Sequence, residues 1–323
     1  MKAVVYTAYG GPDVLKLKEI QKPVPEKDEV LIKIHASTAT AAEGMMRRGD
    51  TLMSRVVLGF AKPARKYQIL GLELAGTIEA LGKNVSRFEV GKKVYGFTGF
   101  KPGAYAEYIC MNEKASLVRM PDNLGFNEAA SVVDGSTTAY FFLIKKAKIR
   151  AGQRVLIIGA SGSIGSYAVQ LSNYLSANVT GVCSTKNIAM VQNLGAKRVI
   201  DYTNEDFTQE GITYDVIFDT VGKSSYSECK PVLSKRGIYL ATNGRLLANL
   251  YLNVLTSLRK GKKFIYAMSV DKREALNYIT PLLEEKKMRP VIDKVYHLEN
   301  IVEAHQYVES GHKRGNVVIQ IIN

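Results

Sequence analysis

Alternation of apolar and polar residues dominates the first ~120 positions of the chain. The segments 14–20 (VLKLKEI) and 29–37 (EVLIKIHAS) follow a period of two. A strand with one buried face has this period because successive side chains point to opposite faces. Further short strands are expected at 1–7, 72–82, 92–97 and 104–111, with glycine or proline residues between them. This pattern predicts a compact, barrel-like β domain.

The pattern changes near Pro121, where helices and apolar runs begin to alternate. A helix is predicted over 126–147, with Asn127 as its N-cap. The run RVLIIGA (154–160) is apolar almost throughout, as in a parallel strand buried on both faces. Helices and strands then alternate over 163–176, 178–184, 187–196, 197–202, 214–222, 237–244 and 262–269, and again in the tail over 273–288, 291–298, 298–310 and 316–322. The central part of the chain is therefore predicted to be a doubly wound α/β domain.

Composition and charge narrow the classes of function. The chain has 323 residues, 46% of them hydrophobic, and no apolar stretch approaches the ~20 residues of a membrane span, so no membrane partner is expected. Its first residues lack the apolar core of a signal peptide, which predicts a cytoplasmic protein. The net charge of +14 can attract phosphate-bearing ligands, but it fits a solvated basic surface equally and identifies no partner. Nucleic acid is unlikely because no RRM, zinc-finger or KH signature accompanies the charge. Three widely separated cysteines exclude a disulfide framework: Cys110, Cys183 and Cys229.

The segment IIGASGSIGSYAVQLS carries the sharpest chemical signal. Its glycines Gly159, Gly162 and Gly165 follow an apolar strand and open a helix. Glycine is needed there for a tight turn, for close approach of the backbone to a pyrophosphate, and for helix–strand packing. The first helical N–H groups then face the phosphates. The loop is therefore predicted to bind a dinucleotide through Gly159, Ser161, Gly162, Ser163, Ile164 and Gly165.

The end of the second predicted strand indicates which dinucleotide binds. NAD-binding enzymes place Asp or Glu there for the ribose hydroxyls, whereas this chain has Ser184, Thr185 and Lys186. A lysine attracts a 2′-phosphate, and hydroxyls can donate hydrogen bonds to it. NADPH is therefore favoured over NADH, although Lys186 would also fit as a solvated residue at the start of the next helix.

The ordered set of motifs resembles the zinc-free quinone oxidoreductase (zeta-crystallin-like) branch of the medium-chain dehydrogenase/reductase superfamily. The matching segments are MKAVVYTAYGGPDVLKL, GLELAGTIEALGKNVSRFEVGKKVYGF, GAYAEY, AASVVDGSTTAY, LGAKRVIDY, YDVIFDTVG and GNVVI, with the glycine loop among them. The resemblance implies a GroES-like catalytic domain over 1–121 and 271–323 beside a Rossmann domain over 122–270. It also implies a homodimer, with KKFIYAMS (262–269) as an edge strand.

The zinc ligands of the related alcohol dehydrogenases are absent. Where that branch has Cys, this chain has the run 35–38 (His-Ala-Ser-Thr), and where it has Gly-His-Glu, this chain has Leu72 before Glu73. Leucine cannot ligate a metal, and a hydroxyl is a poor zinc ligand. Without a Lewis acid, hydride transfer suits an acceptor activated by conjugation, such as a quinone or an α,β-unsaturated carbonyl.

Candidate catalytic residues follow from the same resemblance. Where the family has Asn and Asp in a VNxxDxxxRxG pattern, this chain has Thr40, which keeps a hydroxyl donor but is shorter than the amide, and Glu43. Arg47 follows, and Thr138 matches a family threonine near the nicotinamide. Thr40 and Glu43 would equally fit a helix start and its capping carboxylate, and Thr138 would equally fit a helix-interior hydroxyl. Further cofactor contacts implied by motif are Tyr202, Val221, Gly222, Asn243 and Asn316.

Two other functions remain open at this point. One is a generic NADP-dependent alcohol or carbonyl oxidoreductase. The other is a nucleotide-sensing or nucleic-acid-binding protein that keeps the fold but not the turnover.

Overall fold

The computed structural model describes residues 1–244 and 246–322, with no side-chain description for Met53 and Leu246. The chain forms two compact units, Met1–Asp134 with Val270–Asn323, and Gly135–Ser269. The division inside the chain falls at residue 134, within helix α3 (Phe126–Tyr140), whereas the sequence pattern places it at residue 121. The first half of α3 belongs with the β-rich unit because the Asp134 amide donates to Glu73 Oε2 over 3.2 Å.

The first unit is built on a seven-stranded sheet with the order β14-β15-β3-β4-β5-β7, in which β6 pairs with β3. All neighbours run antiparallel except β14 and β15. A separate antiparallel pair is formed by β1 and β2. The strands are β1 (Lys2–Val5), β2 (Lys16–Glu19), β3 (Glu29–Ala39), β4 (Glu73–Leu81), β5 (Lys93–Phe97), β6 (Tyr108–Asn112), β7 (Ser116–Arg119), β14 (Ile292–His297) and β15 (Asn316–Gln320).

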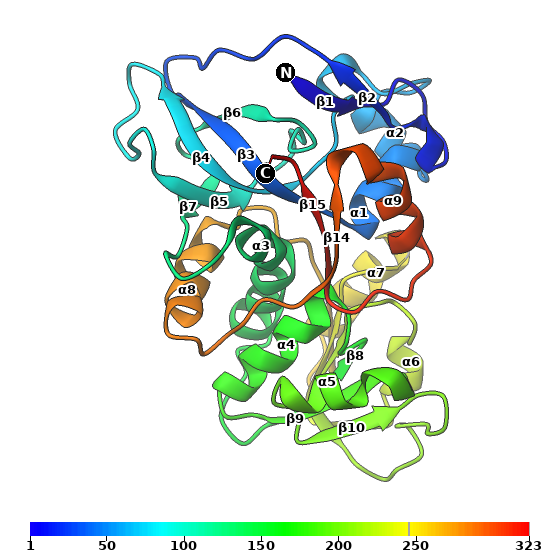
Figure 1. The fold of residues 1–323 in the computed structure, drawn as a ribbon. Coiled ribbons are helices and arrows are strands. Elements are labelled where there is room, and N and C mark those ends of the chain that lie inside the picture. The colour runs from blue at the N-terminus through cyan, green and yellow to red at the C-terminus, as the bar shows by residue number, and fades with distance from the viewer. Residues whose placement is uncertain (245, 323) are drawn as a thin grey trace. The chain divides into compact units, whose positions relative to one another are not determined.

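Alternating residues of β3 explain why this sheet has a core. Val30, Ile32 and Ile34 are fully buried and pack with Leu74 and Val94 of the neighbouring strands. The C-terminal elements complete the unit, since β15 pairs with β3 and α9 packs near α1 (Figure 1). The helices of this unit are α1 (Ala41–Arg48), α2 (Leu52–Leu58), α8 (Arg273–Glu284) and α9 (Ile301–Glu309), with single turns at Pro12–Val14, Arg65–Tyr67 and Leu298–Asn300.

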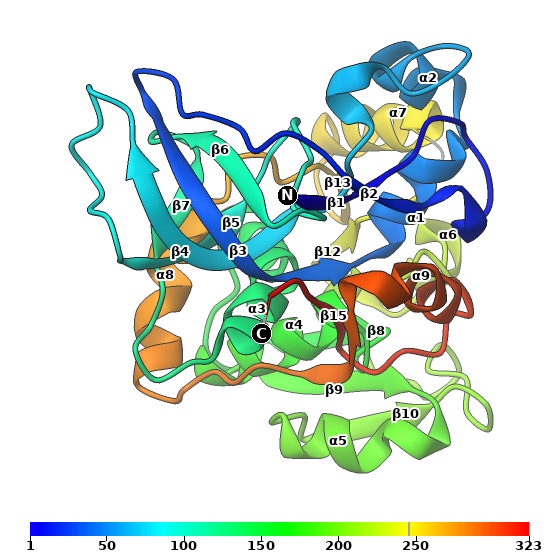
Figure 2. The same ribbon diagram turned by 45° about the horizontal axis from the view of Figure 1, so that its top comes forward.

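The second unit is a six-stranded parallel sheet with the order β10-β9-β8-β11-β12-β13. In chain order within the unit this is 3-2-1-4-5-6, the doubly wound arrangement whose ligands bind where the order reverses, between β8 and β11. Figure 2 shows α5 running along β9 and β10. The elements are β8 (Arg154–Ile158), α4 (Ser163–Tyr174), β9 (Asn178–Cys183), α5 (Ile188–Asn193), β10 (Arg198–Asp201), β11 (Tyr214–Asp219), α6 (Tyr226–Cys229), β12 (Leu233–Ala241), α7 (Leu246–Ser257) and β13 (Lys263–Tyr266), with a 3-10 turn at Thr185–Asn187.

The predicted fold class is confirmed, and two local expectations need correction. The helix predicted over 126–147 is α3 followed by a π-helical segment at Phe141–Lys146. Asn127 is not the N-cap, because α3 already begins at Phe126 and the Glu128 carboxylate accepts from the Gly125 amide at 2.8 Å. A carboxylate three residues into a helix makes this contact in a capping box.

Candidate cofactor site and candidate catalytic residues

The glycine loop after β8 has the geometry that a phosphate-binding turn requires at two of its three glycines. Gly159 has a φ of +78°, and a Cβ there would lie 2.6 Å from Val221 Cγ1. A Cβ on Gly165 would lie 2.1 Å from the Gly159 carbonyl oxygen, so the loop packs on α4 only with glycine at this position. Both positions exclude any other residue without rearrangement.

Gly162 differs from its two neighbours. It is the N-cap of α4, has a φ of −81° and a ψ of −178°, and makes no side-chain cap. This backbone is ordinary extended chain, so the position does not need glycine for a left-handed conformation. The nearest atom to a Cβ on Gly162 would be the Gly159 carbonyl oxygen at 3.4 Å. The protein itself thus leaves the space in front of Gly162 open, at the start of a helix whose first N–H groups lack intrahelical acceptors.

Ser184, Thr185 and Lys186 follow β9, as predicted from the sequence. Lys186 is exposed, and no carboxylate within the described ranges pairs with its ammonium group. The Thr185 hydroxyl, in contrast, donates to Asp201 Oδ2 at 2.5 Å, so its proton is already engaged by the protein. Ser184 and Lys186 therefore remain as donors for a phosphate at this strand end.

Asp201, at the end of β10, was not among the residues singled out from the sequence. It is only 4% exposed, and its carboxylate accepts from the Thr203 amide and hydroxyl, from Thr185, and from the Asn204 side chain. These donors, Thr185 first among them, lower the pKa of Asp201. The next residue, Tyr202, is 62% exposed.

A second buried carboxylate shapes the loop after β11. Asp219 Oδ1 accepts from the amides of Val221 and Gly222, at 3.0 and 2.8 Å, while Oδ2 accepts from the Ser224 amide at 3.1 Å. Gly222 has a φ of +71°, and a Cβ there would meet Asn243 Cβ at 2.9 Å. Val221, Gly222 and Asn243 thus lie at the carboxyl ends of adjacent strands, as their motifs predicted, with Val221 also against Gly159.

In the first unit, Thr40 and Glu43 form a capping box at the start of α1. Glu43 is fully buried, and its carboxylate accepts from the Thr40 amide at 2.8 Å, the Leu72 amide at 2.8 Å and the Tyr105 hydroxyl at 2.9 Å. Burial raises the pKa of Glu43 to about 7, against the opposing effect of these donors. The Tyr105 hydroxyl also lies 3.1 Å from Nε2 of His305, another buried side chain.

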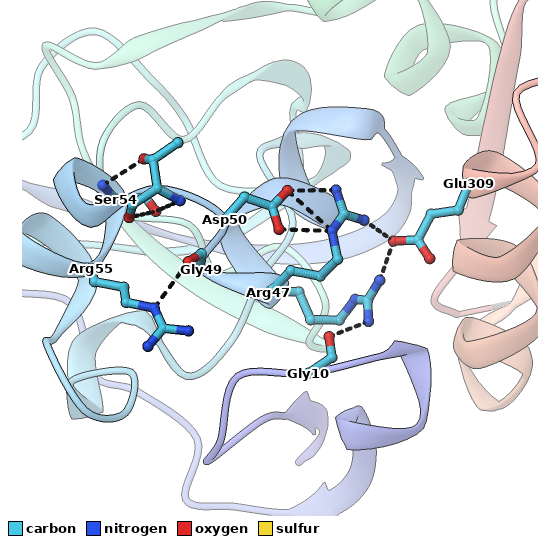
Figure 3. A network of polar contacts seen from close by, with 9 residues as sticks. Gly10, Arg47, Gly49, Asp50, Ser54, Arg55 and Glu309 are labelled. Carbon is cyan, nitrogen blue, oxygen red and sulfur yellow. Dashed lines mark hydrogen bonds and ion pairs between the residues drawn. The ribbon is translucent and has the colours of Figure 1, made fainter.

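Arg47, one turn further along α1, is a second buried charged residue and pairs with the C-terminal helix α9. Its guanidinium pairs with Glu309 and donates to the Gly10 carbonyl at 2.7 Å, although the side chain is fully buried (Figure 3). Burial, together with the charges of Arg47 and Arg48, lowers the pKa of His305 to about 3, so this imidazole is neutral at physiological pH. The contacts between Thr40 and Glu43 are those of the capping carboxylate that the sequence offered as an alternative. A catalytic role for Thr40 or Glu43 stays a prediction.

The two remaining candidates lie in different units. Thr138 is on α3 and only 8% exposed. Asn316 begins β15 in the first unit, where its side-chain amide donates to the Val291 carbonyl at 3.0 Å. Contacts of either residue with a cofactor stay predictions.

Glu73, which follows Leu72 at one of the positions that ligate zinc in the related alcohol dehydrogenases, lies in a largely buried ionic cluster with Asp134 and Lys272. Glu73 is 1% exposed, and burial together with the neighbouring Asp134 carboxylate raises its pKa. The Lys272 ammonium pairs with Asp134 and lies 4.3 Å from the centroid of the Phe97 ring. Among the described residues, no group of three or more His, Cys, Asp or Glu side chains is arranged to hold a metal ion. Nor does the described part of the chain contain a helix that is long and apolar enough to cross a membrane.

Comparison with known proteins places these features in a family. Residues 26–122 match the alcohol dehydrogenase GroES-like domain, and residues 194–319 match the zinc-binding dehydrogenase family. A GroES-like unit beside a Rossmann unit with this glycine loop defines the chain as a medium-chain dehydrogenase/reductase, an oxidoreductase with a nicotinamide cofactor.

Individual relatives define the branch. A quinone-oxidoreductase homolog from Spinacia oleracea is 30% identical over 99% of this chain and 98% of its own length. The NADPH-dependent alkenal/one oxidoreductase from Arabidopsis thaliana is 29% identical over 99% of this chain and 79% of its own. The structure of the quinone oxidoreductase from Coxiella burnetii superposes with a TM-score of 0.90, at 29% identity, over 100% of this chain and 99% of that one. The chain belongs to the quinone oxidoreductase branch of the superfamily.

Proposed function

We propose that this protein is a zinc-independent, NADPH-dependent reductase of quinones or α,β-unsaturated carbonyl compounds. The observation that carries the choice of cofactor is the end of β9. There, the exposed Lys186, which has no ion-pair partner in the described part of the chain, stands in place of the carboxylate of NAD-binding enzymes. The names of the relatives, which include a quinone oxidoreductase and an NADPH-dependent alkenal/one oxidoreductase, support the choice of substrate.

The residues of the second unit fit the cofactor. The open space before Gly162 would accommodate a pyrophosphate at the N-terminus of α4, where the first helical amides are available as donors. Ser184 and Lys186 supply a hydroxyl and a positive charge for a 2′-phosphate. Asp219 holds the amides of Val221 and Gly222 in a fixed loop at the strand edge where the sheet order reverses.

Bound NADPH supplies a hydride, and each turnover also consumes one proton, giving NADP⁺ and either a hydroquinone or a saturated carbonyl compound. The protein contributes orientation and hydrogen bonding to this chemistry. Thr40 and Thr138 are the proposed donors toward a developing oxyanion. Glu43, buried and bonded to Thr40, Leu72 and Tyr105, is placed to hold Thr40 in position. We further propose a cytoplasmic homodimer that pairs through β13, the strand at one edge of the parallel sheet.

Oxidation of NADPH, followed at its absorbance maximum with a panel of acceptors, tests this function. Quinones and enones should be turned over, and saturated ketones of matched size should not. Turnover of saturated ketones at equal rates would favour a generic carbonyl oxidoreductase instead. Tight NADPH binding without turnover of any acceptor would favour a nucleotide-sensing protein. Light scattering that gives the mass of a single chain would refute the dimer.

A further inference from the structure

Asn187 joins the two segments that are expected to bind phosphate. It follows the 184–186 segment directly and occupies the N-cap position of α5 without a side-chain capping bond, and it is only 5% exposed. Its side-chain nitrogen lies 3.0 Å from Ser161 Oγ, in the glycine loop, and 3.3 Å from Ser184 Oγ, at the end of β9. One buried amide therefore contacts one predicted phosphate-binding serine in each segment.

The chemistry of these contacts determines where the serine protons point. An amide nitrogen carries two hydrogens and only donates, so each serine oxygen accepts one of them. A hydroxyl whose oxygen accepts still has its own hydrogen to donate. Within residues 1–244 and 246–322, neither Ser161 nor Ser184 donates that hydrogen to another protein group. Phosphate oxygens only accept, so both hydroxyls are left in the state that a phosphate requires.

The other end of the same amide supports this polarity. The Oδ1 atom of Asn187 is buried and has no hydrogen-bond partner among the described residues. A buried polar atom without a hydrogen-bond partner is uncommon in proteins, so some other interaction must fix the orientation of the Asn187 amide. The amide is held by what its nitrogen donates, because its oxygen accepts nothing from the protein.

We propose that Asn187 is a positioning residue for NADPH. It directs the hydroxyl of Ser161 toward the pyrophosphate and the hydroxyl of Ser184 toward the 2′-phosphate. The inference rests on the proposed function, since it assumes that a dinucleotide occupies this strand edge. It adds a residue that neither the glycine pattern nor the strand-end pattern singles out.

Dissociation constants for NADPH and NADH, measured by fluorescence titration, provide the test. Asn187→Ala should weaken NADPH about 10-fold and NADH about 3-fold, because only the Ser161 contact serves both cofactors. Asn187→Asp should weaken NADPH by about 100-fold or more, since its carboxylate accepts from both serines and turns their protons away from the phosphates. The matched control is Asn178→Ala, which removes a side-chain bond to the Gly152 carbonyl at the other end of β9 and should change neither constant.

The outcomes separate this inference from the proposed function. A wild-type protein that binds neither cofactor would refute both. A wild-type protein that binds NADPH, together with an Asn187→Asp variant that binds it equally well, would refute only the role of Asn187. Two further outcomes would show that Asn187 does not act through Ser184. One is an equal loss of affinity for NADPH and NADH in Asn187→Ala. The other is an NADPH-specific loss on Asn187→Ala that persists when Ser184 is also replaced by alanine.

Discussion

Replacing Gly162 by valine separates cofactor binding from folding at the glycine loop. The backbone at Gly162 has a φ of −81°, which valine adopts without strain, and a Cβ would meet only the Gly159 carbonyl oxygen at 3.4 Å. The fold should therefore survive, in contrast to Gly165, where a Cβ would lie 2.1 Å from that same oxygen. The added methyl groups would instead fill the space that the pyrophosphate is expected to occupy.

The loss of affinity follows from the contacts that a displaced pyrophosphate gives up. Hydrogen bonds from backbone N–H groups to a charged phosphate are worth about 1.5–3 kcal/mol each. Loss of one or two of them predicts a decrease of roughly 10- to 10⁴-fold. NADPH and NADH should suffer alike, because both carry the pyrophosphate.

Titration of the purified Gly162→Val variant with NADPH and NADH measures this effect, and circular dichroism checks that the variant is folded. Gly165→Val serves as the comparison and should lose stability as well as binding. A folded Gly162→Val protein with the affinity of the parent would refute the dinucleotide site, and the proposed reductase activity would fall with it.

The other predictions test the cofactor preference, the metal and the buried carboxylate. Lys186→Ala should weaken NADPH by about 1–3 kcal/mol and leave NADH unchanged in titrations; equal effects would show that Lys186 does not contact the 2′-phosphate. Activity should persist in chelator, and elemental analysis should find no zinc; one tightly bound zinc per chain would contradict this. The folded chain should keep a proton on Glu43 up to about pH 7, whereas the unfolded chain releases it near the ordinary pKa of 4.5, so stability should fall as pH rises through this window and level off above it. In Glu43→Gln, the free energy of unfolding should lose this pH dependence, which amounts to at most about 3 kcal/mol between pH 4.5 and 7, in denaturant unfolding at several pH values. An unchanged pH profile would show that Glu43 does not titrate in this range.

The features that the sequence predicted well are those with local causes. The parallel sheet follows from short apolar runs that alternate with helices, and its strand order matches the fold class expected from them. Gly159 and Gly165 were predicted because a tight turn and close packing exclude a Cβ at a fixed spacing. At Gly162 the pattern shows that glycine is present but not which of its properties is used; the backbone there is extended, and the space in front of it is open.

Contacts between distant parts of the chain could not be predicted in this way. Glu43 and Tyr105 are 62 residues apart, and Tyr105 and His305 are 200 residues apart. No periodicity relates such positions, so the sequence alone predicts that Glu43 is either a capping or a catalytic carboxylate and not which contacts it makes. Glu43 is buried because the fold brings the Leu72 amide and the Tyr105 hydroxyl within hydrogen-bonding distance of its carboxylate oxygens. Asn187 was missed for a related reason, because its partner Ser161 lies 26 residues away on another strand end.

The placement of Asp201 explains how a carboxylate can lie near a predicted 2′-phosphate site. NAD-binding enzymes place an acidic residue at the end of the second strand, where it faces the ribose. Here the carboxylate is on the third strand, at the end of β10, and its two oxygens are occupied by Thr185, Thr203 and Asn204. These hydrogen bonds stabilise the charge of the Asp201 carboxylate and fix the loop after β10, so the oxygens are engaged by protein donors and not by a ligand. The same contacts engage the Thr185 hydroxyl, which leaves the exposed Lys186 and the Ser184 hydroxyl as the proposed donors to a 2′-phosphate. Because the acidic residue builds the loop and the basic residue has no ion-pair partner among the described residues, the arrangement would favour a cofactor with extra negative charge. This is the physical basis of the proposed preference for NADPH over NADH.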